Sequence, residues 1–212
     1  MDTTRLEPVR NVAVVSSAGA GKTTVSEALL YVGGVIPMLG SVMHGTTVSD
    51  FEPEELRHRT STSTSLLQFR WNHTNINLID PPGALDLLGE SLAALQAADA
   101  VILILSGTMG VKTELARLWT RIKELDLPCL VFVNGLDKEN ASFENALESC
   151  RKQLGCVPLP MTVPINSGMN LDSVVDVRHE KLVRSEPSSA KVEHLLVPPP
   201  LESILNRARQ QL

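Results

Sequence analysis

The feature that most constrains the fold of this chain is a short segment, SSAGAGKTT at positions 16–24. It matches the phosphate-binding pattern G-x-x-x-x-G-K followed by Ser or Thr, except that Ser16 stands at the first glycine position. An apolar run typical of a buried strand, NVAVV at 11–15, precedes the segment, and apolar residues at helical spacing follow Lys22. A strand, a glycine-rich turn and a helix in this order predict a phosphate loop rather than a chance turn.

The residues of this loop have chemistry that suits the phosphate groups of a nucleotide. Gly19 and Gly21 let backbone N–H groups approach phosphate oxygens, and the start of the following helix favours anions. Lys22 supplies a positive charge for the β and γ phosphates, and Thr23 offers a hydroxyl group to Mg2+. The predicted nucleotide-binding residues of the loop are Ser17, Ala18, Gly19, Ala20, Gly21, Lys22, Thr23 and Thr24.

Apolar runs alternate with helical patterns along the rest of the first 156 residues. Strands are predicted at 66–71, 75–80, 100–105 and 129–133, and the first two form a hairpin through NHT at 72–74. Helices are predicted after Lys22 and over 85–95, 115–125 and 143–154, and 35–62 is predicted to be a long loop. This order predicts the α/β fold of a P-loop NTPase, with a doubly wound, mainly parallel sheet.

The character of the sequence changes beyond residue 156. The segment VPLPMTVPI predicts a proline-interrupted edge strand, strand-like stretches lie within 171–183, SEPSSAK is a loop, and a helix begins at Pro200. We therefore divide the chain into a nucleotide-binding core, 1–156, and part of an appended α/β subdomain, 157–212, that ends in a helix.

Two later strand ends carry residues that suit a nucleotide site, because ligands of such sheets bind at the carboxyl ends of the strands. Asp80 begins the segment DPPG, in which this carboxylate can hold Mg2+ through a water and the Gly83 N–H can meet a γ-phosphate. Asn134 begins the segment NGLD, and its amide can reach the base or the neighbouring loop backbone. The Asp137 carboxylate can accept two hydrogen bonds from guanine, a donor pair that adenine lacks. Either segment alone predicts only a turn, but their order along the chain predicts a guanine-nucleotide site.

The segments that carry these motifs resemble, in sequence order, the GTP-binding domain of elongation factor G and its paralogues. They are VRNVAVVSSAGAGKTT, HRTSTSTS, NINLIDPPG, AADAVILILSGTMGVKTE, LPCLVFVNGLDK and LGCVPLPMTVPI. These relatives are translational GTPases that act on the ribosome, and the resemblance runs from about residue 9 to residue 183.

The resemblance implies GTP or GDP and Mg2+ as ligands and the ribosome as a partner. It matches Thr62 with the switch threonine that closes over Mg2+ and the γ-phosphate. The implied metal-binding residues are therefore Thr23, Thr62 and Asp80, and the implied catalytic residues are Lys22, Thr62 and Gly83. Residues 157–212 resemble part of the subdomain that this family inserts into its nucleotide domain.

The sequence departs from the family pattern at the residues that orient the attacking water, at those that bind the base and phosphates, and in the switch segment. Ala84 replaces the histidine of Asp-Thr-Pro-Gly-His, and a methyl group cannot hydrogen-bond the attacking water. Gly19 replaces the aspartate of the phosphate loop, RTST at 59–62 replaces Arg-Gly-Ile-Thr, and Gly135 replaces the lysine of Asn-Lys-x-Asp. The closing Ser-Ala base motif and the later ribosome-contacting domains do not occur in these 212 residues.

We therefore expect a truncated or degenerate paralogue in which GTP hydrolysis is weak or lost. The alternatives are a non-catalytic nucleotide-binding or interaction module and an ATP-using P-loop kinase, against which Asp137 argues.

Composition narrows the class of protein and its partners. The net charge of −5 gives no general attraction to DNA or to an acidic membrane, and no apolar run has the ~20 residues of a membrane helix. Three cysteines and a polar N-terminus favour reduced thiols in a cytoplasmic protein. The charged run Glu54, Glu55, Arg57 and Arg59 in the switch loop is expected to be solvated surface.

Overall fold

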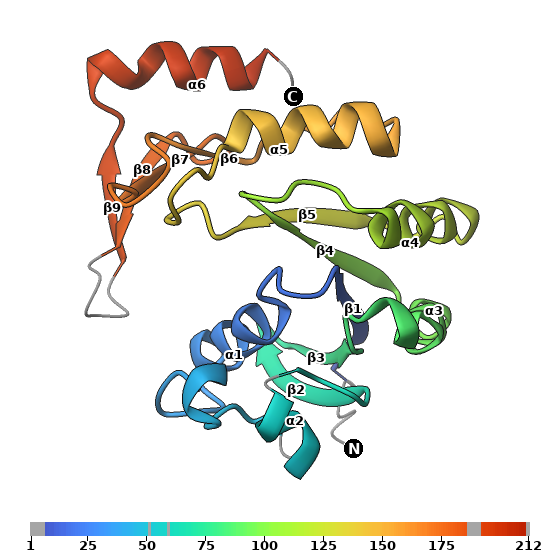
Figure 1. The fold of residues 1–212 in the computed structure, drawn as a ribbon. Coiled ribbons are helices and arrows are strands. Elements are labelled where there is room, and N and C mark those ends of the chain that lie inside the picture. Colours follow the sequence, from blue (N-terminus) through green and yellow to red (C-terminus); the bar gives the residue numbers. More distant parts are fainter. Residues whose placement is uncertain (1–6, 51, 59, 186–191, 211–212) are drawn as a thin grey trace, which may run out of the picture. The chain divides into compact units, whose positions relative to one another are not determined.

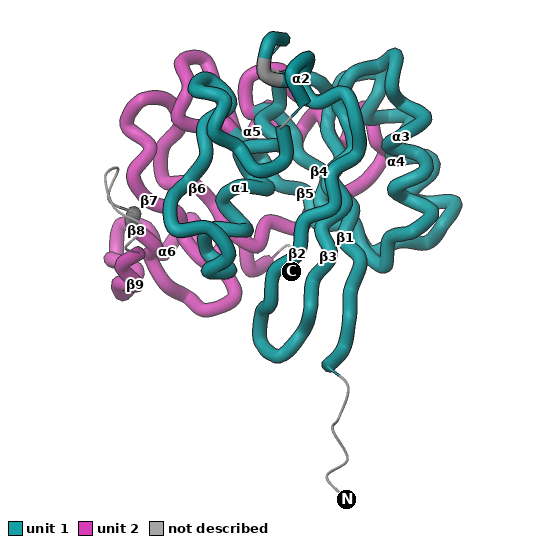
Figure 2. The backbone as a smooth tube through the Cα atoms, turned by 90° about the horizontal axis from the view of Figure 1, so that it is seen from below, with its two compact units in different colours: residues 1–106, 111–134 teal, residues 107–110, 135–212 magenta. Residues whose placement is uncertain are grey.

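The computed structural model describes residues 7–50, 52–58, 60–185 and 192–210 (Figure 1). The chain forms two compact units, Met1–Ser106 with Val111–Asn134 and Gly107–Gly110 with Gly135–Leu212 (Figure 2). The boundary between the units follows Asn134, whereas the predicted division of the sequence follows residue 156. Within the second unit, a hydrogen bond of 3.0 Å from the Ser142 N–H to the Gly107 carbonyl joins the segment before Phe143 to residues 107–110.

The first unit is built on a five-stranded sheet of order β2-β3-β1-β4-β5. Its strands are β1 (Val9–Ser16), β2 (Ser65–Trp71), β3 (Thr74–Asp80), β4 (Ala100–Ser106) and β5 (Cys129–Asn134). Strand β1 runs parallel to β3 and β4, β4 runs parallel to β5, and only β2 is antiparallel to its neighbour. The predicted mainly parallel sheet is therefore confirmed.

Helices cover both faces of this sheet, as a doubly wound fold requires. Helix α1 (Lys22–Val32) packs Leu30 against Val14 and Leu78 on one face. Helices α3 (Leu88–Gln96), which follows the short turn η2 (Leu85–Leu87), and α4 (Thr113–Glu124) lie on the other side (Figure 1).

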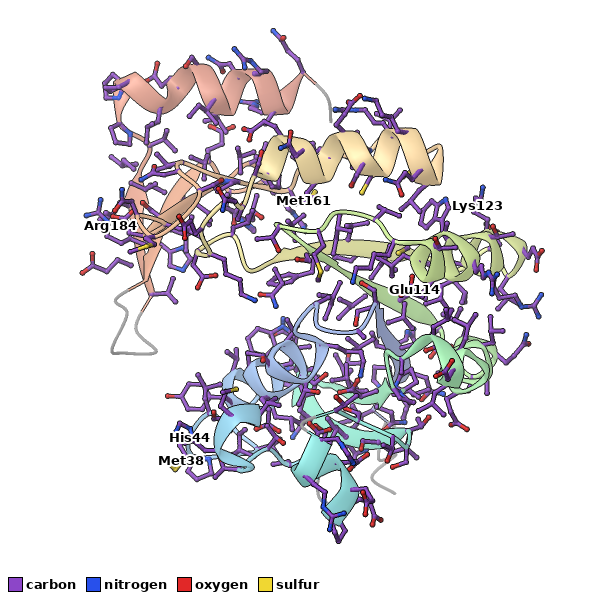
Figure 3. The ribbon with its side chains drawn as sticks, in the orientation of Figure 1. Met38, His44, Glu114, Lys123, Met161 and Arg184 are labelled. Carbon is purple, nitrogen blue, oxygen red and sulfur yellow. The ribbon has the colours of Figure 1, made fainter. Side chains whose placement is uncertain are left out.

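Helix α4 has an apolar stripe and charges that suit its own dipole. It buries Leu115, Leu118 and Ile122, which recur at helical spacing along one face. Glu114 lies in its first turn and Lys123 in its last turn, where each charge complements the helix dipole (Figure 3). The helix predicted over 115–125 is therefore confirmed, with bounds that differ by one or two residues.

The turn between β2 and β3 is tighter than the sequence suggested. Asn72 and His73 both adopt positive φ angles, 44° and 60°, and Thr74 already belongs to β3. Two residues with positive φ form the turn whose twist matches a hairpin, and asparagine tolerates this conformation better than most residues. The hairpin is confirmed, with a loop of two residues instead of three.

The segment 35–62 is not the continuous loop that we predicted. It contains a 3₁₀ turn, η1 (Val42–His44), and a helix, α2 (Pro53–His58). Pro53 suits the first helical position, and the acidic residues of the first turn and basic residues of the last turn complement the helix dipole. A helix of six residues is too short to show a period in the sequence, which explains why the prediction was wrong.

The second unit carries a four-stranded antiparallel sheet of order β6-β7-β8-β9. Its strands are β6 (Thr162–Pro164), β7 (Ser173–Asp176), β8 (Lys181–Ser185) and β9 (Val192–Leu196). Strand β6 lies at an edge of this sheet, as predicted for the proline-interrupted segment. Most of the predicted loop SEPSSAK lies outside the described residues.

Two helical segments complete the second unit. Helix α5 (Phe143–Ser149) continues as a π-helical turn, η3 (Cys150–Leu154), and ends at Gly155, as predicted. A 3₁₀ turn, η4 (Pro199–Leu201), leads into α6 (Glu202–Arg209), which packs Leu205 and Ala208 against Val175 and Leu182 of the sheet. Within the described ranges, no helix combines the length and the apolar character that crossing a membrane requires.

Candidate functional site

The loop between β1 and α1 has the backbone conformation of an anion-binding turn. Gly19 and Gly21 adopt φ angles of 77° and 88°, a region that residues with a Cβ atom rarely adopt. Helix α1 begins directly after Gly21 without a side-chain cap, so the N–H groups of its first turn are not capped by a side chain. Such N–H groups and the helix dipole together favour a phosphate at this position.

Lys22 and Asp80 form a buried ion pair at the base of this loop. The Lys22 Nζ atom contacts Asp80 Oδ1, and the two side chains are only 6% and 2% exposed. Burial raises the pKa of Asp80, and the charge of Lys22 opposes that shift. The second carboxylate oxygen, Oδ2, has no well-formed hydrogen bond among the described residues, although the buried Ser26 hydroxyl lies close enough to lower the pKa. The cation predicted for phosphate and the anion predicted for Mg2+ therefore neutralise each other in this structure.

Two further predicted residues lie against the same loop. A Cβ atom added to Gly83 would lie 3.3 Å from the Ser16 carbonyl oxygen and 3.4 Å from the Ala18 nitrogen. The Asn134 side-chain amide donates to the Ala20 carbonyl at 2.9 Å, so it contacts the loop backbone as predicted. The structure thus brings the ends of β1, β3 and β5 together around residues 17–24 of the loop.

Serine and threonine residues of the loop differ in their exposure. The Ser17 hydroxyl is buried and has no hydrogen-bond partner among the described residues, so it is able to bind a ligand oxygen. Thr23 is half-buried and Thr24 is exposed. Of the two threonines, Thr23 is therefore the one that is more shielded from solvent.

The switch segment reaches the loop through Ser61, a residue that sequence reasoning missed. Ser61 Oγ lies 3.4 Å from Thr23 Oγ1 and donates to Asp50 Oδ1 at 2.7 Å. Asp50 is 4% exposed, and its charge contributes to the raised pKa of Asp80. No periodicity in the sequence distinguishes these two residues from other polar residues of a long loop. The predicted metal ligand Thr62 is exposed, and its hydroxyl lies 3.4 Å from Glu55 Oε1 instead.

Glu55 organises the switch segment from a buried position. Its carboxylate is 1% exposed and accepts hydrogen bonds from the backbone N–H groups of Glu52, Thr62 and Ser63 at 3.2, 2.8 and 3.2 Å. Burial acts to raise the pKa of Glu55, but these hydrogen bonds outweigh it and the pKa is lowered. The prediction of solvated surface is therefore wrong for Glu55.

The other residues of the charged run are Glu54, Arg57 and Arg59. Glu54 and Arg57 are exposed and lie 3.5 Å apart across one helical turn, as expected for solvated surface. Arg59 lies outside the described residues.

The predicted base-recognition residues fall on both sides of the boundary between the units. Asp137 is exposed and belongs to the second unit, so its contact with a base stays a prediction. Gly135, where the family has lysine, adopts a φ angle of 70°. The Lys138 stem lies beside it, with Cδ 3.4 Å from where a Cβ atom at position 135 would stand.

Thr23, Ser61 and Asp50 are linked through their side-chain oxygens, and Asp80 lies at the end of β3, so these residues offer the oxygen ligands that a small divalent cation prefers. Mg2+ prefers oxygen ligands and usually takes one or two carboxylates with water and phosphate oxygens. The buried Oδ2 oxygen of Asp80 is a donor of this kind. No group of three or more His, Cys, Asp or Glu side chains that could hold a metal occurs in the described part of the chain. A magnesium ion here would therefore depend on the nucleotide for part of its coordination.

Ala84 stands at the position where the family pattern has the water-orienting histidine. It is half-buried, has extended backbone angles of φ −74° and ψ 141°, and precedes η2. Its methyl group offers neither a donor nor an acceptor to water.

The chain is similar to a family of GTP-binding domains and to proteins named as ribosome-releasing factors. The family model of the elongation factor Tu GTP binding domain matches residues 7–206. Ribosome-releasing factor 2, mitochondrial, from Anopheles gambiae is 38% identical over 169 residues, which cover 80% of this chain and 23% of the relative. The Bos taurus protein of the same name is 35% identical over 176 residues, 82% of this chain and 23% of the relative.

A solved structure is similar over nearly the whole chain. The crystal structure of ttk003000868 from Thermus thermophilus superposes with a TM-score of 0.87 at 37% identity, covering 97% of this chain and 30% of that protein. The chain spans about a quarter of the length of the curated relatives named above. These matches confirm the resemblance that the sequence motifs predicted.

Proposed function

Because the chain belongs to the family of the elongation factor Tu GTP binding domain, we propose that it binds GTP and GDP together with Mg2+. The observation that carries this proposal is the convergence of Lys22, Asp80 and Asn134 on one glycine-rich loop. Asp80 and Asn134 end β3 and β5, and Lys22 begins the helix that follows the loop after β1, as the nucleotide sites of doubly wound sheets require.

Each residue of the loop has a distinct role in this proposal. The N–H groups of residues 17–24 and Lys22 bind phosphate oxygens, and Lys22 exchanges Asp80 for the phosphate when the nucleotide enters. Thr23 and Asp80 hold Mg2+, Asp80 through a water, and Gly83 directs its N–H toward the γ-phosphate. Bound Mg2+ supplies charge neutralisation for the phosphate oxygens. Thr62 stays a candidate for the metal from the family resemblance alone.

Guanine specificity is assigned to Asp137, and Asn134 contacts the backbone of the loop through the Ala20 carbonyl. Adenine lacks the pair of donors that a carboxylate at this position accepts. Titration of the chain with GTP, GDP and ATP in the presence of Mg2+ tests the assignment, and equal affinity for GTP and ATP would contradict it. Asp137→Ala should weaken GTP binding by about 10- to 150-fold, the equivalent of the 1.5–3 kcal/mol of a charged hydrogen bond. ATP binding should change little.

Hydrolysis of bound GTP is proposed to be slow because Ala84 cannot orient the attacking water. Phosphoryl transfer depends mostly on positioning and charge stabilisation, so the loss of a positioning group is serious. Single-turnover release of phosphate from bound GTP measures this step. We expect a rate about 10²–10⁴-fold below that of a relative with histidine at this position. Release as fast as in such a relative would show that another group orients the water.

A second candidate function is a non-catalytic nucleotide-binding or interaction module, which Ala84 and Gly135 favour. Tight binding of GTP with no detectable phosphate release would support this candidate over a slow GTPase. A ribosomal partner is proposed only because the similar proteins are named as ribosome-releasing factors. The cytoplasmic location predicted from the sequence also stays a proposal, since those relatives are named as mitochondrial.

A further inference from the structure

We propose that Ser61, rather than Thr62, supplies the switch-segment hydroxyl group at the Mg2+ site beside Thr23. This inference rests on the proposed function, because it concerns the metal that accompanies the nucleotide. The family pattern has isoleucine at position 61, so this hydroxyl is a property of this chain.

The position of the Ser61 oxygen fits a metal ligand. Adjacent ligands of octahedral Mg2+ at 2.0–2.1 Å lie roughly 2.9 Å apart. Ser61 Oγ and Thr23 Oγ1 are separated by 3.4 Å, so a shift of about half an ångström would place both around one ion. Asp80, only 2% exposed, has a second carboxylate oxygen, Oδ2, without a well-formed hydrogen bond among the described residues, so this oxygen is open to a water of the metal ion.

Asp50 prepares the Ser61 hydroxyl for this role. Ser61 donates a hydrogen bond to Asp50 Oδ1 at 2.7 Å, so its oxygen is the acceptor in the 3.4 Å contact with Thr23, and a cation can take the place of that long hydrogen bond. A carboxylate that accepts a hydrogen bond from a ligand fixes the ligand's orientation and increases its basicity. Asp50 is buried, so solvent does not compete strongly for this bond.

Thr62 is held away from the same position by Glu55. The Thr62 N–H donates to Glu55 Oε1 at 2.8 Å, and Ser63 binds the same oxygen through its N–H and its hydroxyl at 3.2 and 3.3 Å. Turning Thr62 inward would break the hydrogen bonds to Glu55 and leave this buried carboxylate without these donors. Leaving a buried acceptor unsatisfied is costly, so the segment favours Ser61 inward and Thr62 outward.

The test is a Mg2+ titration of nucleotide binding that uses a fluorescent, non-hydrolysable GTP analogue, because the family resemblance matches Thr62 with a residue that closes over the γ-phosphate. Ser61→Ala should raise the free Mg2+ concentration needed for half-maximal tightening by about 10- to 100-fold, as for loss of a residue that supports a metal. Thr62→Ala should change that concentration less than about twofold, well below the tenfold shift expected for a supporting residue. Ser63→Ala is the matched control, since it removes a serine hydroxyl that lies on Glu55 instead of near Thr23.

Outcomes of this titration separate the inference from the proposed function. Failure of the unmutated chain to bind the analogue with Mg2+ would refute nucleotide binding itself. Normal binding with a Mg2+ defect in Thr62→Ala and none in Ser61→Ala would overturn the assignment of Ser61. Equal weakening of Ser61→Ala with Mg2+ and with EDTA would also overturn it, because a purely structural role would act in both conditions.

Discussion

Replacing Asp80 with asparagine tests whether the buried ion pair controls access of phosphate to Lys22. Asparagine has nearly the same shape but no charge, so Lys22, only 6% exposed, would lose its counter-ion. Removing one partner of a buried ion pair costs about 3–5 kcal/mol because the remaining charge stays uncompensated. A chain of this size shifts its melting temperature by about 2–4 °C per kcal/mol. We therefore expect Asp80→Asn to melt about 6–20 °C lower without ligand.

Anions should reverse this loss of stability. Pyrophosphate in EDTA gives Lys22 a new counter-ion, and the variant does not need to break the pair with Asp80 before it binds. We expect its affinity for Mg2+-free pyrophosphate to increase by at least about tenfold, equivalent to 1.4 kcal/mol. Calorimetric titration and thermal denaturation with and without pyrophosphate measure both effects. Asp50→Asn is the matched control, because that buried carboxylate binds Ser61 instead. Unchanged melting together with unchanged pyrophosphate affinity would refute the reasoning.

Three more predictions follow from other contacts. Glu55→Gln should cost about 2 kcal/mol at pH 7. Because folding lowers the pKa of Glu55 below its ordinary value of 4.5, the ionised carboxylate stabilises the fold at pH values above 4.5. This stabilisation is lost as the pH falls through the folded-state pKa. The urea concentration at the unfolding midpoint, measured between about pH 3 and 7, should therefore decrease less steeply with falling pH in Glu55→Gln than in the exposed control Glu54→Gln. The Cys150 thiol, fully buried and with its pKa raised to about 11, should resist alkylation at about pH 8 in the folded chain and react in urea, as read by mass spectrometry. Gly21→Ala should destabilise the chain by about 1–3 kcal/mol, because its Cβ would lie 2.2 Å from Asn134 Nδ2 at a φ of 88°. Asn134→Ala added to that variant should relieve the clash but not the backbone strain, so denaturation should show only partial recovery.

The sequence by itself determined the elements and the order in which they carry the site. Alternation of apolar runs and helical patterns identified β1, β3, β4 and β5 and the helices α1, α3 and α4, because these signals depend only on neighbouring residues. The glycine-rich loop was recognisable for the same reason, since its pattern, the preceding strand and the following helix are contiguous. The strand ends at Asp80 and Asn134 followed from the rule that parallel strands present their carboxyl ends at one edge.

Only the tertiary structure decided which side chains meet at that edge. The Lys22–Asp80 pair joins residues 58 positions apart, and the bond from Asn134 to the Ala20 carbonyl spans 114 positions. The burial of Glu55 within a charged run, and the inward position of Ser61 in place of Thr62, likewise depend on how a loop folds over the sheet. A local pattern cannot report such contacts, because the free energy of burying a charge or a hydroxyl depends on partners that the chain brings from far along its length.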